Sequence, residues 1–337
     1  MSRPLTVVVP AHGPADQLMP LLQALARQAR DGEPLAVVVS DDASPTPLGP
    51  DLVRPPGVAL EVVRNEANGG PGAARNRGLV EVHTPWVAFL DADTVPGDGW
   101  LARAEVLVQE EGAADFIEGR TRIPADHPPS PFTHATEATP PEQHVAGNVI
   151  LRTSVLRAAG GFDERFFDPS RKLHFREDAE LAFRLEQAGA SITYEPDLLV
   201  DHPPLASTFW GPVKLARRYY FDPLLDREHP AAFRAMNAQR RIGPISLRRA
   251  RHDACVLAVL GEVVLMVGLV GGWGPVARLG LVATLVGWFA TVVALCWRRQ
   301  VRARHVLPVL VVALVVPWTY LWHWWRGVLR FRHRPRL

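Results

Sequence analysis

The stretch Trp86-Val-Ala-Phe-Leu-Asp-Ala-Asp-Thr-Val-Pro-Gly-Asp-Gly-Trp100 carries the strongest signal in this chain. Its first five residues form a continuous apolar run, which is typical of a strand buried on both faces. The run ends at Asp91 and Asp93, and turn-forming residues follow. Because like charges this close repel each other, a positive group is expected beside them. A hard divalent cation shared with substrate phosphates would supply it, and an acidic turn with solvated aspartates is the alternative.

The residues around this stretch predict strands that alternate with helices. Each predicted strand is a short β-rich run, and each predicted helix has apolar residues at helical spacing. The predicted strands are 5–9, 35–39, 58–63 and 86–90, and the predicted helices are 16–28 and 73–82. This order predicts a doubly wound α/β sheet, in which ligands bind beyond the carboxyl ends of the strands. Pro10-Ala-His12, Asp41-Asp42 and Asp91-Ala-Asp93 all fall at that edge.

The following residues carry weaker signals. Segments 149–151 and 192–194 are further strand candidates, and 177–187 is a predicted helix with Gly189 as its stop signal. The proline-rich segment 124–144 is interpreted either as a mobile loop over the site or as a surface insertion.

Charge is distributed unevenly along the 337 residues, whose formal net charge is +2. Residues 248–337 contain thirteen arginines and no lysine, with Asp253 and Glu262 as their acidic residues, and the rest of the chain is acidic. The arginines alternate with apolar runs, which indicates a membrane rather than a nucleic acid as partner. Cys255 and Cys296 lie in those runs, so no disulfide framework is expected, and a reducing compartment fits the remaining residues.

Three apolar segments near the carboxyl end are long enough to cross a bilayer, which takes about 20 residues. They are residues 254–270, 276–297 and 306–325. Arginines flank the first two segments, so the positive-inside rule places both ends of that hairpin in the cytosol. A third crossing would leave the arginines after residue 325 outside, and Pro308 and Pro317 would let the third segment kink or re-enter, so two or three crossings are expected, with the third left open. Glu262 lies within the first segment, where a charge is expensive and is often functional, and a protonated Glu262 packed against a neighbouring helix is the alternative.

Two other segments bear on location. The first residues hold an apolar run too short for a signal peptide, so the large domain is expected in the cytosol. Residues 205–252 mix aromatic side chains with arginine, which is typical of helices in the headgroup layer, and a packed connector is the alternative.

Over about residues 4–225 the order of these motifs resembles the family 2 glycosyltransferases, inverting enzymes with the GT-A fold. The resemblance rests on Val7-Val-Val-Pro-Ala-His12, Ser40-Asp-Asp-Ala-Ser44, Asn68-Gly-Gly-Pro-Gly-Ala-Ala-Arg-Asn-Arg-Gly78, Asp91-Ala-Asp93, Gly160-Gly-Phe-Asp-Glu164 and Arg176-Glu-Asp178. It implies a GT-A domain with a Rossmann-like mixed sheet, followed by transmembrane helices. The implied domains are a catalytic domain over 1–204, with a donor half over 1–123 and an acceptor half over 124–204, a connector over 205–252 and a transmembrane region over 253–337.

The resemblance also implies how the donor would be held. Asp91 and Asp93 would bind Mg²⁺ or Mn²⁺, with His202 as a further ligand. Asp42 would accept a hydrogen bond from the base of a UDP-, GDP- or dTDP-linked sugar. The set implied to contact the donor comprises Pro10, His12, Asp41, Asp42, Gly72, Arg75, Asp91, Arg217 and Arg218. Glycines allow a backbone to approach phosphate closely, and a helix start favours anions, which agrees with this assignment.

On the acceptor side, the resemblance implies that Asp178 is the general base, with Glu177 beside it. The implied function is metal-dependent transfer of one sugar to a hydroxyl acceptor, which could be lipid-linked, by a multi-pass protein at the cytosolic face of the inner membrane. The Gln-x-x-Arg-Trp motif of processive synthases is not evident. The oligomeric state is left open, and no nucleic-acid partner is expected.

Two alternatives remain open. One is a polyprenyl-phosphate sugar synthase, whose anionic acceptor has little need of a base. Another is a catalytically inert membrane scaffold that keeps the fold. A dehydrogenase with a Rossmann fold is less compatible with the sequence, because no Gly-x-Gly-x-x-Gly follows the first strand.

Overall fold

The computed structural model describes residues 3–29, 33–49, 52–134, 144–205, 208–237, 240–242, 245–247, 250–297 and 299–332. The chain divides into two compact units. The first comprises Met1–Pro124 and Thr136–Pro203, and the second comprises Ala125–Ala135 and Pro204–Leu337. The proline-rich segment is therefore divided, since its residues 125–134 belong with the carboxyl-terminal unit.

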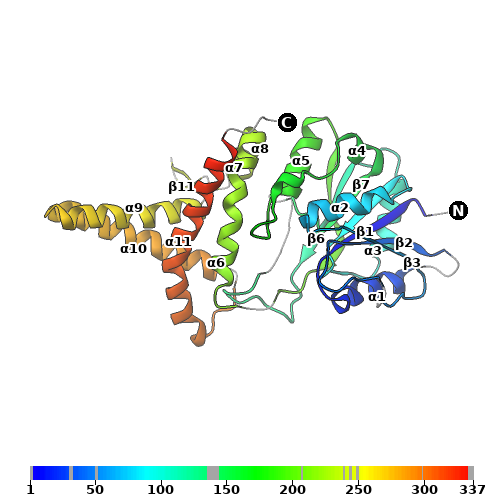
Figure 1. Ribbon diagram of the computed structural model, residues 1–337, viewed down its shortest axis with the longest axis horizontal. Coiled ribbons are helices and arrows are strands. Elements are labelled where there is room, and N and C mark those ends of the chain that lie inside the picture. The colour runs from blue at the N-terminus through cyan, green and yellow to red at the C-terminus, as the bar shows by residue number, and fades with distance from the viewer. Residues whose placement is uncertain are drawn as a thin grey trace. The chain divides into compact units, whose positions relative to one another are not determined.

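The first unit is built on one eight-stranded mixed sheet (Figure 1). The strands are β1 (Leu5–Ala11), β2 (Leu35–Asp41), β3 (Val58–Arg64), β4 (Trp86–Leu90), β5 (Val95–Pro96), β6 (Phe116–Arg122), β7 (Asn148–Arg152) and β10 (Ile192–Asp201). Their spatial order is β3-β2-β1-β4-β7-β6-β10-β5. The first four strands are parallel, whereas β7 and β5 run antiparallel to their neighbours. The mixed α/β sheet expected from the sequence is thus confirmed.

Helices cover both faces of this sheet and form a core on each side. One apolar cluster joins the sheet to α1 (Met19–Gln28) and α3 (Trp100–Gln109). The other joins it to α2 (Gly70–Val80), α4 (Thr153–Ala158) and α5 (Glu177–Gln187). The central strand β4 has all five residues buried, because it faces both clusters. The polar residues that follow β4 therefore lie at the edge of the sheet, where the buried strand ends.

Some elements differ from the sequence-based expectations. The helix expected over 16–28 is divided into a 3-10 turn, η1 (Ala15–Leu18), and α1, whose first turn carries Pro20. Proline is favoured at a helix start because it has no N–H to leave unpaired there. The candidate strand 192–194 extends to Asp201 as β10, with an irregularity after Glu195 where Pro196 interrupts the chain. Helices α3 and α4 and strand β6 were not expected.

Two short strands complete the first unit. After the 3-10 turn η2 (Glu164–Phe166), β8 (Phe167–Asp168) and β9 (Leu173–His174) pair antiparallel just before α5 begins.

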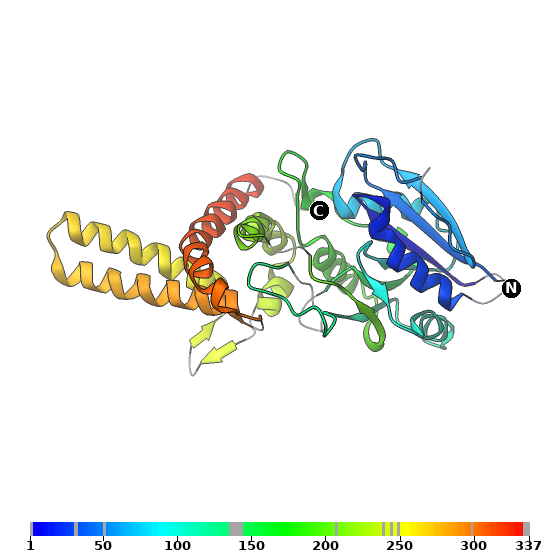
Figure 2. The same cartoon turned by 90° about the horizontal axis from the view of Figure 1, so that it is seen from below.

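The second unit is largely helical (Figure 2). Its elements are α6 (Gly211–Ala216), η3 (Arg217–Phe221), α7 (Asp222–Glu228), α8 (Pro230–Asn237), β11 (Arg240–Ile242), β12 (Ile245–Leu247), α9 (Ala250–Val270), α10 (Gly274–Cys296) and α11 (Ala303–Phe331). Helices α9 and α10 form a hairpin whose backbones approach closely at glycines; a Cβ on Gly280 would lie 2.2 Å from the Leu265 nitrogen. By length and composition, α9, α10 and α11 could each cross a membrane.

Candidate active site

Three predicted metal ligands come together at the carboxyl edge of the sheet. Asp91 and Asp93 follow β4 directly, and His202 follows β10. The antiparallel pairing of β5 with β10 sets Val95 opposite Asp201, which brings His202 back to the acidic turn. Nε2 of His202 lies 3.6 Å from Oδ1 of Asp93. One ligand atom from each of the three residues lies within 4.8 Å of the other two, so the group has the dimensions of a cation site.

The charges at this turn are partly shielded from water. Burial raises the pKa of Asp93, the neighbouring Asp91 adds to that effect, and His202 opposes it. Gly147 makes room for Asp91, because a Cβ at this glycine would lie 2.5 Å from Oδ2 of the carboxylate. The chain thus concentrates negative charge in a crowded turn, where a bound cation would relieve the repulsion.

Arg75 is the positive group beside this turn. It lies on α2 and is buried. Its Nη2 donates a hydrogen bond of 2.8 Å to Oδ1 of Asp91, and its Nη1 lies 3.5 Å from Oε1 of Glu177. The guanidinium also lies over the Phe162 ring, 5.2 Å from the centroid. In this structure Arg75 therefore pairs with carboxylates inside the protein, and its predicted contact with a diphosphate stays a prediction.

Two carboxylates open helix α5 and differ sharply in their affinity for protons. Burial alone would raise the pKa of Glu177, but the nearby His174 and Arg75 lower it to about 2. Burial and the charge of Glu177 raise the pKa of Asp178 to about 6, against a hydrogen bond of 2.8 Å from the Ala179 N–H. When the pKa values of two adjacent carboxylates differ in this way, one carboxylate stays charged and the other exchanges protons near neutral pH.

The start of α5 is fixed by unusual backbone. Arg176, which precedes the helix, has φ of 80°, a left-handed conformation that is uncommon for a residue with a side chain. Its guanidinium lies 4.2 Å from the centroid of the Phe175 ring. The strained residue turns the chain from β9 into α5 and so determines where Glu177 and Asp178 lie.

Asp42 holds the glycine-rich loop in place. Its Oδ1 accepts hydrogen bonds from the Gly69 N–H at 2.9 Å and from Nδ2 of Asn65 at 2.8 Å, and its Oδ2 accepts one from the Gly70 N–H at 2.8 Å. Gly70 has φ of +82°, and a Cβ there would lie 2.5 Å from the Phe167 ring. Gly72 is buried in the first turn of α2. The loop backbone is therefore ordered around the Asp42 carboxylate, whose predicted bond to a nucleotide base stays a prediction.

The neighbouring Asp41 also makes its bonds within the protein. Its carboxylate accepts hydrogen bonds from the Ser44 and Leu48 N–H groups and pairs with Arg64. Although burial opposes it, these bonds hold the pKa of Asp41 below its usual value. Asp41 thus shapes the turn after β2, and a direct contact with the donor stays a prediction.

The end of β1 contributes the remaining predicted donor residues of the first unit. Pro10 lies in the strand, and its register partner is Ser40 of β2. His12 follows the strand and is exposed. Its Nδ1 lies 2.9 Å from the Asp42 carbonyl oxygen and 3.1 Å from Nδ2 of Asn68. His12 therefore borders the glycine-rich loop, and its contact with the donor stays a prediction.

Arg217 and Arg218 belong to the second unit, at the start of η3. Nη1 of Arg218 lies 2.9 Å from Nε2 of His134, which belongs to the same unit. Their predicted contact with the diphosphate stays a prediction.

One polar pair near the acceptor residues was missed from the sequence. Oε1 of Glu118, a buried residue of β6, lies 2.7 Å from Nδ1 of His144. Burial alone would lower the pKa of His144. The neighbouring Glu118 outweighs burial and raises the pKa of His144, and the charge of Asp178 adds to this effect. The signal that could have revealed Glu118 is a lone carboxylate directly after the apolar Phe116-Ile117.

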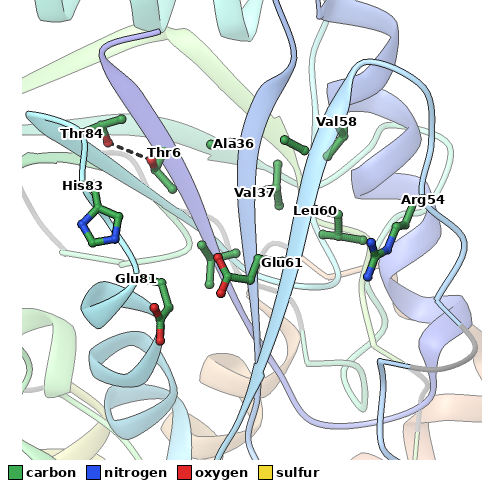
Figure 3. A pocket seen from close by; sticks show the side chains of 12 residues that line it. Thr6, Ala36, Val37, Arg54, Val58, Leu60, Glu61, Glu81, His83 and Thr84 are labelled. Carbon is green, nitrogen blue, oxygen red and sulfur yellow. Dashed lines mark hydrogen bonds between the residues drawn. The ribbon is translucent and has the colours of Figure 1, made fainter. Parts of the chain in front are cut away.

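A groove of about 560 Å³ lies elsewhere in the first unit (Figure 3). It is lined by the amino-terminal halves of β1 to β3, including Thr6 and Val58, and by His83 and Thr84 after α2. Ligands of doubly wound sheets bind at the opposite, carboxyl ends of the strands. The groove is therefore distinct from the acidic turn and is not assigned to the chemistry.

Comparison with known proteins identifies a family. The profile described as glycosyl transferase family 2 matches residues 6–174. A pre-mycofactocin glycosyltransferase of Mycobacterium tuberculosis is 32% identical over 214 residues, which cover 59% of this chain and 43% of that protein. The chain thus spans less than half the length of this relative. Glycosyltransferase AglE of Haloferax volcanii is 24% identical over 220 residues, covering 59% of this chain and 66% of that protein.

Two solved structures resemble the chain. Staphylococcus aureus TarS 1-349 in complex with UDP-GlcNAc has a TM-score of 0.48 at 18% identity, covering 96% of this chain and 92% of that one. The mannosyltransferase PcManGT of Pyrobaculum calidifontis, in complex with GDP-Man and Mn²⁺, has a TM-score of 0.48 at 16% identity. The match covers 99% of this chain and 89% of that one. The family match includes Asp42, Asp91 and Asp93 but ends before Glu177.

Proposed function

Because this chain belongs to glycosyl transferase family 2, we propose that it transfers a sugar from a nucleoside-diphosphate sugar to a hydroxyl acceptor, with inversion at the anomeric carbon. The donor is UDP-, GDP- or dTDP-linked. The observation that carries the proposal is Arg75, which pairs with Asp91 on one side and Glu177 on the other. This one side chain joins the acidic turn to the start of α5, which carries Asp178.

The residues of the acidic turn fit a hard divalent cation. The two carboxylates suit Mg²⁺ or Mn²⁺, and Asp91 and Asp93, with His202 as a further ligand, would hold the ion. When bound, such an ion would neutralise charge on the leaving diphosphate. Gly147 keeps the space beside Asp91 free of a side chain, and Arg75 fixes the orientation of that carboxylate.

Asp178 is proposed to take the proton from the acceptor hydroxyl. As the hydroxyl oxygen bonds to the anomeric carbon, the bond from that carbon to the diphosphate oxygen breaks, and the proton passes to the Asp178 carboxylate. A pKa of about 6 leaves this carboxylate largely ionised at neutral pH and still basic enough to accept a proton. Glu177 stays charged throughout and, by repulsion, helps to keep Asp178 basic.

The donor is proposed to bind along the carboxyl ends of β1, β2 and β4. The diphosphate is proposed to bind against the backbone of residues 68–72 and of the first turn of α2, because N–H groups at a helix start attract anions. The Asp42 carboxylate orders that loop. Membrane attachment through the carboxyl-terminal helices, with the catalytic unit on the cytosolic side, completes the proposal.

The proposal is tested by incubating the purified full chain with a panel of UDP-, GDP- and dTDP-sugars, with Mn²⁺ or Mg²⁺, and measuring release of the nucleoside diphosphate. We expect release from one donor class that EDTA abolishes and Mn²⁺ restores. Release that persists in EDTA would contradict the metal assignment. Absence of release and of transfer with every donor would contradict the enzymatic proposal in favour of an inert scaffold.

The acceptor class is tested with Asp178→Asn. A hydroxyl acceptor must lose a proton, so this variant should lose most of its transfer activity. A lipid phosphate is already anionic and has little need of a base. Near-wild-type transfer to a polyprenyl phosphate by Asp178→Asn would therefore identify the protein as a polyprenyl-phosphate sugar synthase instead.

A further inference from the structure

Helix α11 carries two apolar faces with different surroundings. One face is buried and includes Val309, Val312, Val316, Tyr320 and Phe331. The other is an exposed apolar stripe at helical spacing. This stripe, called the tryptophan stripe below, consists of Leu307, Val311, Leu314, Trp318, Trp322, Trp325 and Leu329. A helix with apolar residues on both faces has protein on one side and requires an apolar environment on the other.

The buried face is covered by α6, η3, α7 and the segment around Phe132. At the amino end of α11, the His305 ring packs edge-on against the Phe132 ring, with the two ring centroids 5.9 Å apart. In the middle of α11, the ring centroids of Tyr320 and Tyr219 lie 4.4 Å apart. At the carboxyl end, Arg227 pairs with the Phe331 carbonyl oxygen. The covering segments thus follow α11 along nearly its whole length.

Those covering segments are charged, which argues against a membrane-spanning position for α11. Lys214, Arg217, Arg218, Asp222 and Arg227 all lie on α6, η3 and α7. If α11 crossed the bilayer, these groups would enter the hydrocarbon layer beside it, where such charges are expensive. The same charges are compatible with the cytosolic side of the headgroup layer.

The α9–α10 hairpin contacts α11 mainly near the end remote from its own turn. His252 packs against Tyr320, and Cys255, Val292 and Cys296 share an apolar cluster with α11. In Figure 2 the hairpin extends away from α11 and is not aligned beside it. From His252 to Val270 the helix has 19 residues and is about 28 Å long at 1.5 Å per residue, which is close to the hydrocarbon thickness. The hairpin is therefore long enough to cross.

Tryptophan and arginine on α11 complement a membrane surface. Trp318, Trp322 and Trp325 belong to a residue type enriched at the membrane–water interface. Arg302 and Arg304 lie near one end of the helix and Arg330 and Arg332 at the other, so a helix along the surface places all of them among anionic headgroups. Trp318 also links the stripe to the hairpin, since its Nε1 donates a hydrogen bond of 2.7 Å to Oε2 of Glu262. Glu262 lies about 15 Å along α9 from His252, so this indole reaches below the headgroups into the acyl boundary.

From these observations we propose that α11 lies along the cytosolic surface of the membrane, with the tryptophan stripe at the boundary between headgroups and acyl chains, and that only α9 and α10 cross. This inference rests on the proposed membrane attachment. It explains how the arginines before and after α11 stay on the same side as the catalytic unit.

Topology is tested with single cysteines in the full chain, after Cys255→Ala and Cys296→Ala, in sealed vesicles treated with an impermeant maleimide. Gln300→Cys and Arg332→Cys should be labelled from the same side, and Gly274→Cys from the opposite side. Labelling of Arg332→Cys together with Gly274→Cys would show that α11 crosses and overturn the proposal. Labelling of all three from one side would overturn the crossing of the hairpin.

Depth is tested with spin labels on the same cysteine-free chain in vesicles containing anionic lipid. Labels at Leu307, Leu314 and Leu329 should report one shallow depth. The matched control is the exposed stripe of α10, where labels at Leu279, Val286 and Val293 lie about 10 Å apart along the helix and the label at Val286 should be the deepest. A comparable gradient along α11, or labels shielded from lipid by another protein copy, would overturn the proposal. Neither measurement depends on activity, so failure here is distinguishable from failure of the proposed transfer reaction.

Discussion

Nη2 of Arg75 lies 2.8 Å from Oδ1 of Asp91, although the two residues come from different elements, α2 and the turn after β4. The same guanidinium approaches Glu177 at 3.5 Å. Because Arg75 is buried, its charge is poorly screened and acts on both carboxylates. A single arginine thereby fixes the distance between the proposed donor and acceptor sides.

Arg75→Met should therefore destabilise the protein strongly. Removing one partner of a buried ion pair leaves the other charge uncompensated, which costs about 3–5 kcal/mol. Adding Glu177→Gln to this variant should restore part of the loss, because it removes one of the stranded charges. The control is Arg77→Met on the same helix, whose more exposed pair with Glu81 is worth about 0.3–0.5 kcal/mol. Thermal unfolding in detergent measures the stability of each variant. Equal losses of stability in Arg75→Met and Arg77→Met would contradict the role of Arg75.

Asp178→Asn should lower kcat by about 10²–10⁴-fold and leave donor binding unchanged, since the amide cannot accept the acceptor proton. The wild-type kcat/KM should rise with pH through about 6 and then level off, because Asp178 must be ionised to act as a base. Steady-state kinetics between pH 5 and 8 check both statements. Glu186→Gln, an exposed residue of the same helix, is the control. A flat profile in the wild type would exclude Asp178 as the base.

The raised pKa of Asp178 also predicts a stability effect that does not depend on activity. A carboxyl whose folded-state pKa exceeds its unfolded value stabilises the protein below the unfolded pKa, and this stabilisation is lost as pH rises through the folded pKa of about 6. Asp178→Asn should therefore unfold at a higher temperature than the wild type at pH 8, and the gap should shrink at pH 5. Melting curves at the two pH values test this, and a gap that grows at low pH would refute it.

Asp93→Asn should abolish metal-dependent release of the nucleoside diphosphate and weaken Mn²⁺ binding, because it removes one of two carboxylates in the cluster. Mn²⁺ titration followed by electron paramagnetic resonance measures the ion directly, without a substrate. Asp98→Asn, which changes an exposed residue between β5 and α3, should bind Mn²⁺ like the wild type. Unchanged Mn²⁺ binding in Asp93→Asn would place the cation elsewhere.

His202→Asn should weaken Mn²⁺ binding by roughly 10-fold, since it removes the imidazole whose Nε2 faces Asp93 but leaves both carboxylates. His83→Asn is the control, because His83 lines the groove remote from the acidic turn. The same titration serves both variants. If His83→Asn and His202→Asn change Mn²⁺ binding equally, His202 is not a ligand.

Much of the first unit could be predicted from local sequence. The run 86–90 has the bounds of β4, and 177–187 those of α5, because each pattern of apolar residues ends at an unmistakable polar or glycine signal. Strand β6 was missed because its Glu118-Gly-Arg-Thr-Arg122 has no continuous apolar run. The Glu118–His144 pair was missed for a related reason: 26 residues separate its partners, and only the sheet brings them together.

The sequence by itself determined the acidic strand end, the glycine-rich turn and the apolar carboxyl-terminal segments, since hydrophobic pattern and turn chemistry are local properties. Only the tertiary structure decided which distant groups meet. The pairing of β5 with β10 brings His202 to Asp93, and the packing of α2 places Arg75 between Asp91 and Glu177. Composition makes α11 a candidate membrane span, whereas the charged helices packed along it favour a place at the surface. Electrostatic effects depend on distance and burial, which the order of residues along a chain does not specify.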